Sequence, residues 1–164
     1  SAVARSAGFL ALAIMVLAIG GAWAFQLIGG IKPCPLCLEQ RVPYYAAIPI
    51  AAIALFLSLR VPGLARLGLL AAAAVMIWGV GLGVYHAGAE WAFWPGPNTC
   101  GDAGQEVRDA SNLLAVIEET ELISCTQETG RVLGLSFAGW NVVAAGSAAL
   151  LMLFAAARPT RPAQ

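Results

Sequence analysis

Four long segments without a charged side chain constrain this 164-residue chain more than any other feature. A hydrocarbon core roughly 30 Å thick is crossed by about 20 apolar residues in a helix, which satisfies its own backbone hydrogen bonds in lipid. None of the segments alternates polar and apolar residues as a barrel strand does. The sequence therefore predicts an all-α integral membrane protein, a four-helix bundle in one membrane domain, with spans at residues 9–28, 42–59, 67–86 and 135–157.

The composition excludes a soluble domain, because 60% of the residues are hydrophobic, 11% are charged and the mean hydropathy is +0.79. The first segment also has features of a secretory signal, since Arg5 precedes it and Ala22-Trp23-Ala24 resembles a cleavage site. Its length and the three spans that follow favour a helix that is not cleaved.

The charges are distributed asymmetrically along the chain. All nine acidic residues lie between Glu39 and Glu128, whereas arginines without nearby acids stand at positions 5, 60, 66, 158 and 161. The positive-inside rule then predicts that residues 1–8, 60–66 and 158–164 are cytoplasmic and that residues 29–41 and 87–134 are outside. The arginines are too scattered to indicate nucleic-acid binding.

The second outer loop, residues 87–134, is longer than a simple connection requires. Within it, residues 111–122 have an apolar face and an acidic face, which predicts a short amphipathic helix on the membrane surface or over the bundle. Gly96, Gly101 and Gly104 provide flexible points, so this loop could approach the shorter one.

All four cysteines, Cys34, Cys37, Cys100 and Cys125, lie in the two outer loops. They admit three interpretations: structural disulfides, a zinc site, or a redox centre. Zinc is the weakest, because Cys100 and Cys125 are not spaced as a Cys-x-x-Cys pair and an oxidising exterior opposes thiolate ligands. We therefore expect no metal.

The spacing of Cys34 and Cys37 favours the redox interpretation over a structural one. A disulfide that closes so short a loop gains little from loop-closure entropy. We expect Cys37 at the start of the second helix, where the helix dipole favours a thiolate, with Arg41 one turn later on the same face. A guanidinium there would stabilise a thiolate or another anion formed beside it.

At these residues the chain resembles the bacterial disulfide bond formation protein B (DsbB) family. The resemblance lies in "KPCPLC" at residues 32–37 with Arg41 four residues on, in "YHAGAEW" and "WPGPNTC" before Cys100, and in "GLSFAGWN" after Cys125. It covers all four spans and both outer loops. It implies a four-helix bundle in the bacterial inner membrane, with the cysteine loops in the periplasm.

The resemblance also implies an activity: a thiol:quinone oxidoreductase that reoxidises a periplasmic thioredoxin-like dithiol oxidase (DsbA type) with membrane quinone, either ubiquinone or menaquinone. Cys100 and Cys125 would form the disulfide that the partner attacks, and Cys34 and Cys37 would pass the electrons on. By the family pattern Cys37 contacts the quinone ring, Arg41 holds and polarises it, and a histidine near the outer end of the third helix, here His86, belongs to the same site.

Two other classes remain open from the sequence. The first is a non-catalytic four-span interaction protein with two structural disulfides. The second is an enzyme resembling vitamin K epoxide reductase, although in that class the membrane Cys-x-x-Cys pair falls late in the chain and here it falls early.

Overall fold

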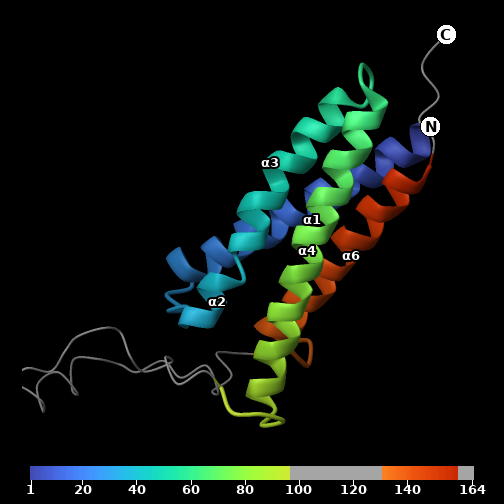
Figure 1. The fold of residues 1–164 in the computed structure, drawn as a ribbon. Coiled ribbons are helices and arrows are strands. Elements are labelled where there is room, and N and C mark those ends of the chain that lie inside the picture. Colours follow the sequence, from blue (N-terminus) through green and yellow to red (C-terminus); the bar gives the residue numbers. More distant parts are fainter. Residues whose placement is uncertain (97–130, 159–164) are drawn as a thin grey trace, which may run out of the picture.

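The computed structural model describes residues 1–96 and 131–158, and the described part is mostly helical (Figure 1). In chain order the helices are α1 (Ala2–Leu27), α2 (Pro35–Glu39), α3 (Val42–Leu57), α4 (Pro62–Glu90) and α6 (Phe137–Ala157). Two short strands, β1 (Arg131–Val132) and β2 (Leu135–Ser136), precede α6. The expected amphipathic helix at residues 111–122 lies outside the described residues.

Four helical stretches are long and apolar enough to cross a membrane: α1, α2 together with α3, α4, and α6. The predicted bundle of four transmembrane helices is therefore confirmed. The third helix is longer than its predicted span, because it begins at Pro62 and ends at Glu90. Proline is well suited to this start, since its fixed φ angle fits a helix and its missing N–H group would have no partner there.

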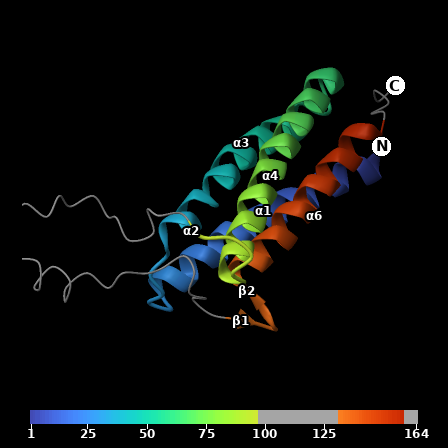
Figure 2. The ribbon, with the colours of Figure 1, turned by 60° about the horizontal axis from the view of Figure 1, so that its bottom comes forward.

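The helices pack so that α4 lies against both α3 and α6, and α1 lies against α6 (Figures 1 and 2). The start of α1 and the end of α6 lie at the same end of the bundle. The short helix α2 and the β1–β2 hairpin lie toward the opposite end, which we call the cysteine end because it contains Cys34 and Cys37.

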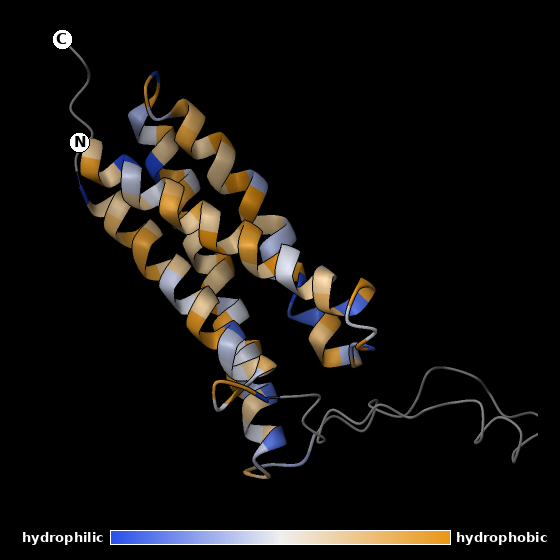
Figure 3. Ribbon diagram, turned by 180° about the vertical axis from the view of Figure 1, so that it is seen from behind, coloured by the Kyte–Doolittle hydropathy of each residue, from blue (hydrophilic) through white to orange (hydrophobic). Residues whose placement is uncertain are grey.

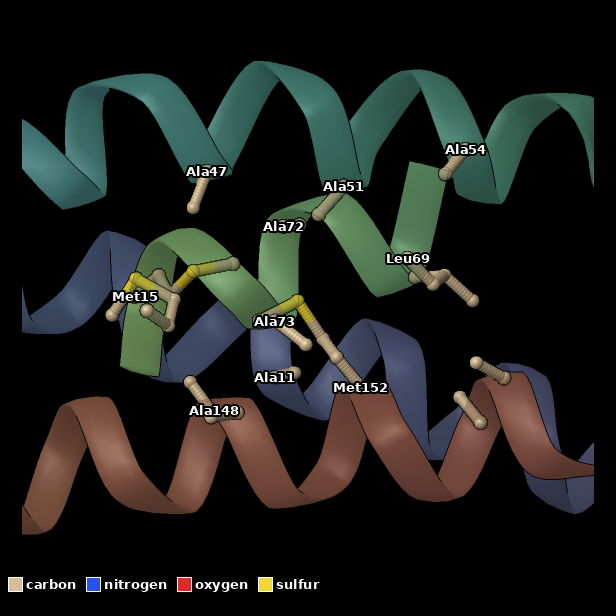
Figure 4. Close-up of a cluster of buried hydrophobic side chains, with 14 of the residues drawn as sticks. Ala11, Met15, Ala47, Ala51, Ala54, Leu69, Ala72, Ala73, Ala148 and Met152 are labelled. Atoms are coloured by element: carbon tan, nitrogen blue, oxygen red, sulfur yellow. The ribbon is translucent and has the colours of Figure 1, made fainter. Parts of the chain in front are cut away.

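The middle of the bundle is built from small and flexible apolar side chains. Ala11, Ala51 and Ala148 are fully buried, and Met15 and Met152 fill the space between the helices (Figure 4). The large apolar side chains instead face outward. The hydropathy colouring shows that the helices are mostly hydrophobic along their length (Figure 3). This distribution is typical of helices that pack closely through small residues and expose bulky ones to lipid.

The second span begins in two steps rather than as one continuous helix. We expected Cys37 to start the second helix, but α2 ends at Glu39 and α3 begins at Val42. Pro43 explains the break, because it has no N–H group to donate to the carbonyl of Glu39 and its ring would clash with that carbonyl. Arg41 consequently stands at the junction, as the residue that caps α3.

The β1–β2 hairpin was not predicted from the sequence. Val132 pairs with Leu135, and the two residues between them, Leu133 and Gly134, both have positive φ angles. Such a two-residue turn matches the twist of the strands, and glycine adopts it without strain. The Trp140 Nε1–H group donates to the Val132 carbonyl at 2.7 Å, which fastens the hairpin to the first turn of α6.

Candidate functional site

The two cysteines of the first outer loop lie side by side. Cys34 caps α2, and its Sγ atom accepts a hydrogen bond from the backbone N–H of Cys37 at 3.3 Å. The two sulfur atoms are 3.0 Å apart. Cys34 is fully buried, whereas Cys37 is partly exposed. The pair is thus close enough to form a disulfide without movement of the backbone.

The surroundings of Cys34, which immediately precedes the second candidate span, favour its thiolate. A hydrogen bond from the Cys37 thiol lowers the pKa of Cys34 most, and burial opposes that shift. His86 and the backbone N–H of Cys37 lower it further, so the net pKa lies well below the ordinary value of a thiol. Cys34 is therefore the sulfur of the pair that loses its proton more readily.

A cavity of about 410 Å³ lies beside Cys37. Its walls are mostly apolar and come from α1 (residues 17–26), α6 (residues 137–144) and Val132 of the hairpin, while residues 31–33 and 37–44 contribute further side chains. Leu17 and Phe25, two of the lining residues, are also exposed on the outer apolar face of the bundle. The volume is within the range of small-molecule sites, which is about 300–1,000 Å³.

Arg41 lines the same cavity as Cys37 and is 8% exposed. Its Nη1 atom donates to Gln26 Oε1 at 2.8 Å, and its guanidinium carbon lies 5.2 Å from the centre of the Trp23 ring. Among the residues that the structure describes, no carboxylate lies within ion-pair distance of Arg41. A buried cation without a counter-ion is costly, so its charge remains available to an electronegative ligand.

The structure places His86 next to Cys34 rather than on the cavity wall. Its Nε2 atom lies 3.7 Å from Cys34 Sγ and 3.6 Å from Glu90 Oε1. The ring is 2% exposed and is not among the residues that line the cavity. His86 therefore contacts Cys34, whereas Arg41 lines the cavity beside Cys37.

Gln26, which binds Arg41, and three further polar residues of the site were missed in the sequence analysis: Gln40, Tyr44 and Asn141. All three line the cavity, and they form hydrogen bonds to one another or to His86. Asn141 lies inside an otherwise apolar span, and a polar residue at that depth usually faces the interior and has a function. This was the signal that could have identified it.

The atoms of Cys34, Cys37 and His86 that could ligate a metal lie within 4.8 Å of one another. The sequence analysis weighed zinc against the spacing of all four cysteines and did not consider His86 as a ligand. The expectation that the protein holds no metal remains a prediction. Cys100 and Cys125 lie outside the described residues, so their pairing remains a prediction as well.

Comparison with known proteins agrees with these features. The family model described as "Disulfide bond formation protein DsbB" matches residues 4–155. Disulfide bond formation protein B 1 of Pseudomonas savastanoi pv. phaseolicola is 34% identical over 138 residues, which are 81% of this chain and 78% of the relative. Disulfide bond formation protein B of Pseudomonas syringae pv. tomato is 33% identical over 138 residues, or 82% and 78% of the two chains. No solved structure matches the chain significantly.

Proposed function

Because the chain belongs to the DsbB family of disulfide bond formation proteins, and is thus a membrane oxidoreductase of that process, we propose that membrane quinone oxidises its Cys34–Cys37 pair in the cavity beside Arg41. Of the classes left open above, neither an interaction protein with structural disulfides nor an enzyme resembling vitamin K epoxide reductase accords with this family. The quinone, the route of the electrons and the partner are parts of the proposal.

The observation that carries the proposal is that Cys37 and the Arg41 guanidinium line one apolar cavity, and that no carboxylate of the described residues lies within ion-pair distance of Arg41. The apolar walls suit a quinone ring and the beginning of its isoprenoid tail. The exposed lining residues Leu17 and Phe25 would let the tail continue into lipid. Uncharged walls alone would suit any lipid-soluble molecule, whereas the cation selects one whose oxygen atoms gain negative charge.

The residues of this chain then have distinct roles. A bound quinone supplies an acceptor for two electrons and two protons. The two thiols of Cys34 and Cys37 lose those electrons and protons when they join as a disulfide. Arg41 orients the acceptor through its N–H groups and stabilises the charge that develops there, in surroundings where water does not screen it. Gln26 and Trp23 hold the guanidinium in place.

The second cysteine pair completes the route. In the proposal, a reduced periplasmic oxidase of the thioredoxin-like DsbA type attacks a disulfide between Cys100 and Cys125. The resulting thiols then reduce the disulfide of Cys34 and Cys37 by thiol–disulfide exchange. Both outer loops would face the periplasm, with the chain in the bacterial inner membrane and both ends cytoplasmic. The start of α1 and the end of α6 lie together, at the end of the bundle away from α2 (Figure 1), as that orientation requires.

A turnover assay tests this function. Purified protein in lipid nanodiscs receives a reduced thioredoxin-like oxidase and quinone, and the quinone absorbance is followed with time. We expect steady reduction of quinone by the intact protein and background rates for Cys37→Ser and for Cys100→Ser. Ser6→Ala, at an exposed position near the start of α1 and far from the site, serves as the control. Absence of quinone reduction by the intact protein, or full turnover by Cys37→Ser, would reject the proposal.

A further inference from the structure

A chain of hydrogen bonds connects the cavity wall to Cys34 through four side chains. The Tyr44 hydroxyl donates to Asn141 Oδ1 at 2.7 Å, and Asn141 Nδ2 donates to Gln40 Oε1 at 2.7 Å. Gln40 Nε2 lies 2.5 Å from His86 Nδ1, and His86 Nε2 lies 3.7 Å from Cys34 Sγ. The chain thus crosses from α3 to α6, back to the α2–α3 junction, and on to α4.

The orientation of the Gln40 amide sets the direction of this chain. Its Nε2 atom lies 3.4 Å from the carbonyl oxygen of Leu36 as well as beside His86. If the amide were reversed, its oxygen would face the Leu36 oxygen and its nitrogen would face Asn141 Nδ2. Both contacts would then be repulsive. Reversal of the Asn141 amide would relieve the second contact, but the repulsion between the Gln40 oxygen and the Leu36 oxygen would remain. The amide nitrogen of Gln40 therefore points at His86.

The direction of these hydrogen bonds favours one of the two neutral tautomers of His86. The Gln40 N–H group needs an acceptor, so Nδ1 of the neutral imidazole carries the lone pair and Nε2 carries the proton. We propose that Gln40, Asn141 and Tyr44 are positioning residues that hold His86 as its Nε2-protonated tautomer, so that the ring donates a hydrogen bond toward the sulfur of Cys34.

Burial of His86 and Gln40 makes a mismatched hydrogen bond between them costly. His86 is 2% exposed and Gln40 is 5% exposed, so no bulk water can compensate for a donor that faces another donor. The Nε2–H group has Cys34 Sγ within hydrogen-bond distance of a sulfur acceptor, whereas Glu90 Oε1, at 3.6 Å, lies beyond the distance of an N–H···O hydrogen bond. The hydrogen bond to the sulfur is strongest when Cys34 is a thiolate, since charged acceptors bind more tightly than neutral ones.

Close packing fixes the Asn141 side chain. A Cβ atom at Gly83 would lie 3.1 Å from Asn141 Nδ2 and 2.8 Å from Val142 Cγ2, so α4 and α6 approach each other closely at this glycine. Asn141, Gln40 and Tyr44 also line the cavity. The polar groups that a cavity ligand would touch are therefore the same groups that determine the tautomer of the histidine beside Cys34.

The tautomer can be measured directly, because His86 is the only histidine of the chain. The full-length protein is labelled with ¹⁵N-histidine, reduced, and placed in nanodiscs at neutral pH. The ¹⁵N chemical shifts of the single ring then report which nitrogen carries the proton. We expect a protonated Nε2 and an unprotonated Nδ1. A protonated Nδ1 in the wild-type protein would overturn the proposal, and this result needs no variant that must fold.

Two substitutions test the positioning residues. Gln40→Glu introduces a carboxylate, which only accepts, so we expect the Nδ1 signal to move into the protonated range. Asn141→Leu removes one of the two contacts that orient Gln40 and leaves only the 3.4 Å contact with the Leu36 carbonyl, so we expect a second tautomer to appear beside the first. Ser58→Ala is the matched control, because Ser58 is also a buried polar residue but bonds only to the Leu55 carbonyl, at the other end of the bundle. Unchanged Nδ1 and Nε2 signals in both test variants would also overturn the proposal.

The consequence for catalysis rests on the proposed function, whereas the tautomer does not. For Asn141→Leu we expect the rate at which quinone oxidises the reduced Cys34–Cys37 pair to fall about tenfold, as for loss of a hydrogen bond to a charged group. Ser58→Ala, at the other end of the bundle, should keep the wild-type rate. An Asn141→Leu rate equal to that of the control would refute the catalytic part. If wild-type protein reduced no quinone at all, the proposed function would fail while the NMR result still decided the tautomer.

Discussion

The two ends of the bundle are built on different principles. Of the buried polar and charged residues in the described part of the chain, Gln40, Arg41, His86 and Ser136 lie toward the cysteine end. Ser58, at the other end, only bonds back to the Leu55 carbonyl at 2.6 Å. The middle is filled by alanine and methionine. Apolar packing and the polar groups of the site are therefore separated along the length of the bundle.

This separation has a physical reason. Buried polar groups in an apolar medium are stable only with hydrogen-bond partners, and each such group restricts how the helices can pack. Small apolar residues impose no such condition and allow the helices to approach closely. A change in the middle of the bundle should therefore affect stability, and a change at the cysteine end should affect electron transfer.

Among substitutions that compare the two ends of the bundle, Arg41→Leu should change the reaction with quinone most. It removes the guanidinium from the cavity but keeps an apolar side chain, so we expect the KM for quinone to rise by about tenfold or more, the loss typical of a hydrogen bond to a charged group. Exchange between the partner and Cys100–Cys125 should change much less. Steady-state kinetics over a range of quinone concentrations measures the first effect, and stopped-flow mixing with reduced partner measures the second.

Arg60→Leu is the matched control, because Arg60 also lies over an aromatic ring, 5.5 Å from the centre of Phe56, but at the end away from the cysteines. We expect its KM to equal that of the wild-type protein. Equal effects of the two arginine substitutions, or an Arg41→Leu change confined to partner exchange, would contradict the place assigned to Arg41.

A smaller effect is expected from the surroundings of Cys34. Because the Cys37 thiol and His86 lower the pKa of Cys34, its thiolate should persist below the pH at which an ordinary cysteine, with a pKa of about 8.5, becomes protonated. His86→Ala removes one of these contributions, so the pKa should rise and the thiolate fraction at mildly acidic pH should fall. Thiolate absorbance in the reduced protein, recorded against pH, gives both titrations.

The corresponding control is Cys34→Ser, which should abolish the titration step that His86→Ala shifts. If His86→Ala left the titration step of Cys34 at its wild-type pH, or moved it to lower pH, then His86 would not lower the pKa of Cys34 as the geometry indicates.

The smallest effect on catalysis is expected in the middle of the bundle. Met76 is fully buried, and Met76→Ala should lower the free energy of unfolding by roughly 2–5 kcal/mol, as for other methionine truncations in cores. The KM for quinone should not change. Thermal unfolding in nanodiscs and the turnover assay measure the two quantities. A large rise in KM for this variant would show that the two regions are not separate.

The sequence predicted the parts of this protein that local pattern determines. The four spans follow from runs of apolar residues, and the nearness of Cys34 to Cys37 follows from their spacing in the chain. We also expected Arg41 and Cys37 to lie on the same side of the site, but for a reason that the structure does not support. We expected one continuous helix, and Pro43 instead breaks it, yet both residues still line the same cavity.

The sequence could not predict features that depend on how helices are rotated against one another. Asn141 and Gln40 are 101 positions apart, and their contact depends on the packing of α6 against the start of α3. The packing of α4 against α2 places His86 beside Cys34 rather than in the cavity. The hairpin escaped prediction for another reason, because strands of two residues show no periodicity.

The most direct test of the central claim is a single-turnover reaction of a protein whose only cysteines are Cys34 and Cys37. Cys100→Ser and Cys125→Ser remove the second pair. The protein is reduced, mixed without oxygen with an equimolar amount of quinone, and its free thiols are counted by alkylation and mass spectrometry. We predict that both thiols disappear together as a Cys34–Cys37 disulfide while one quinol forms per protein. Quinone that stays oxidised beside two free thiols would contradict the account.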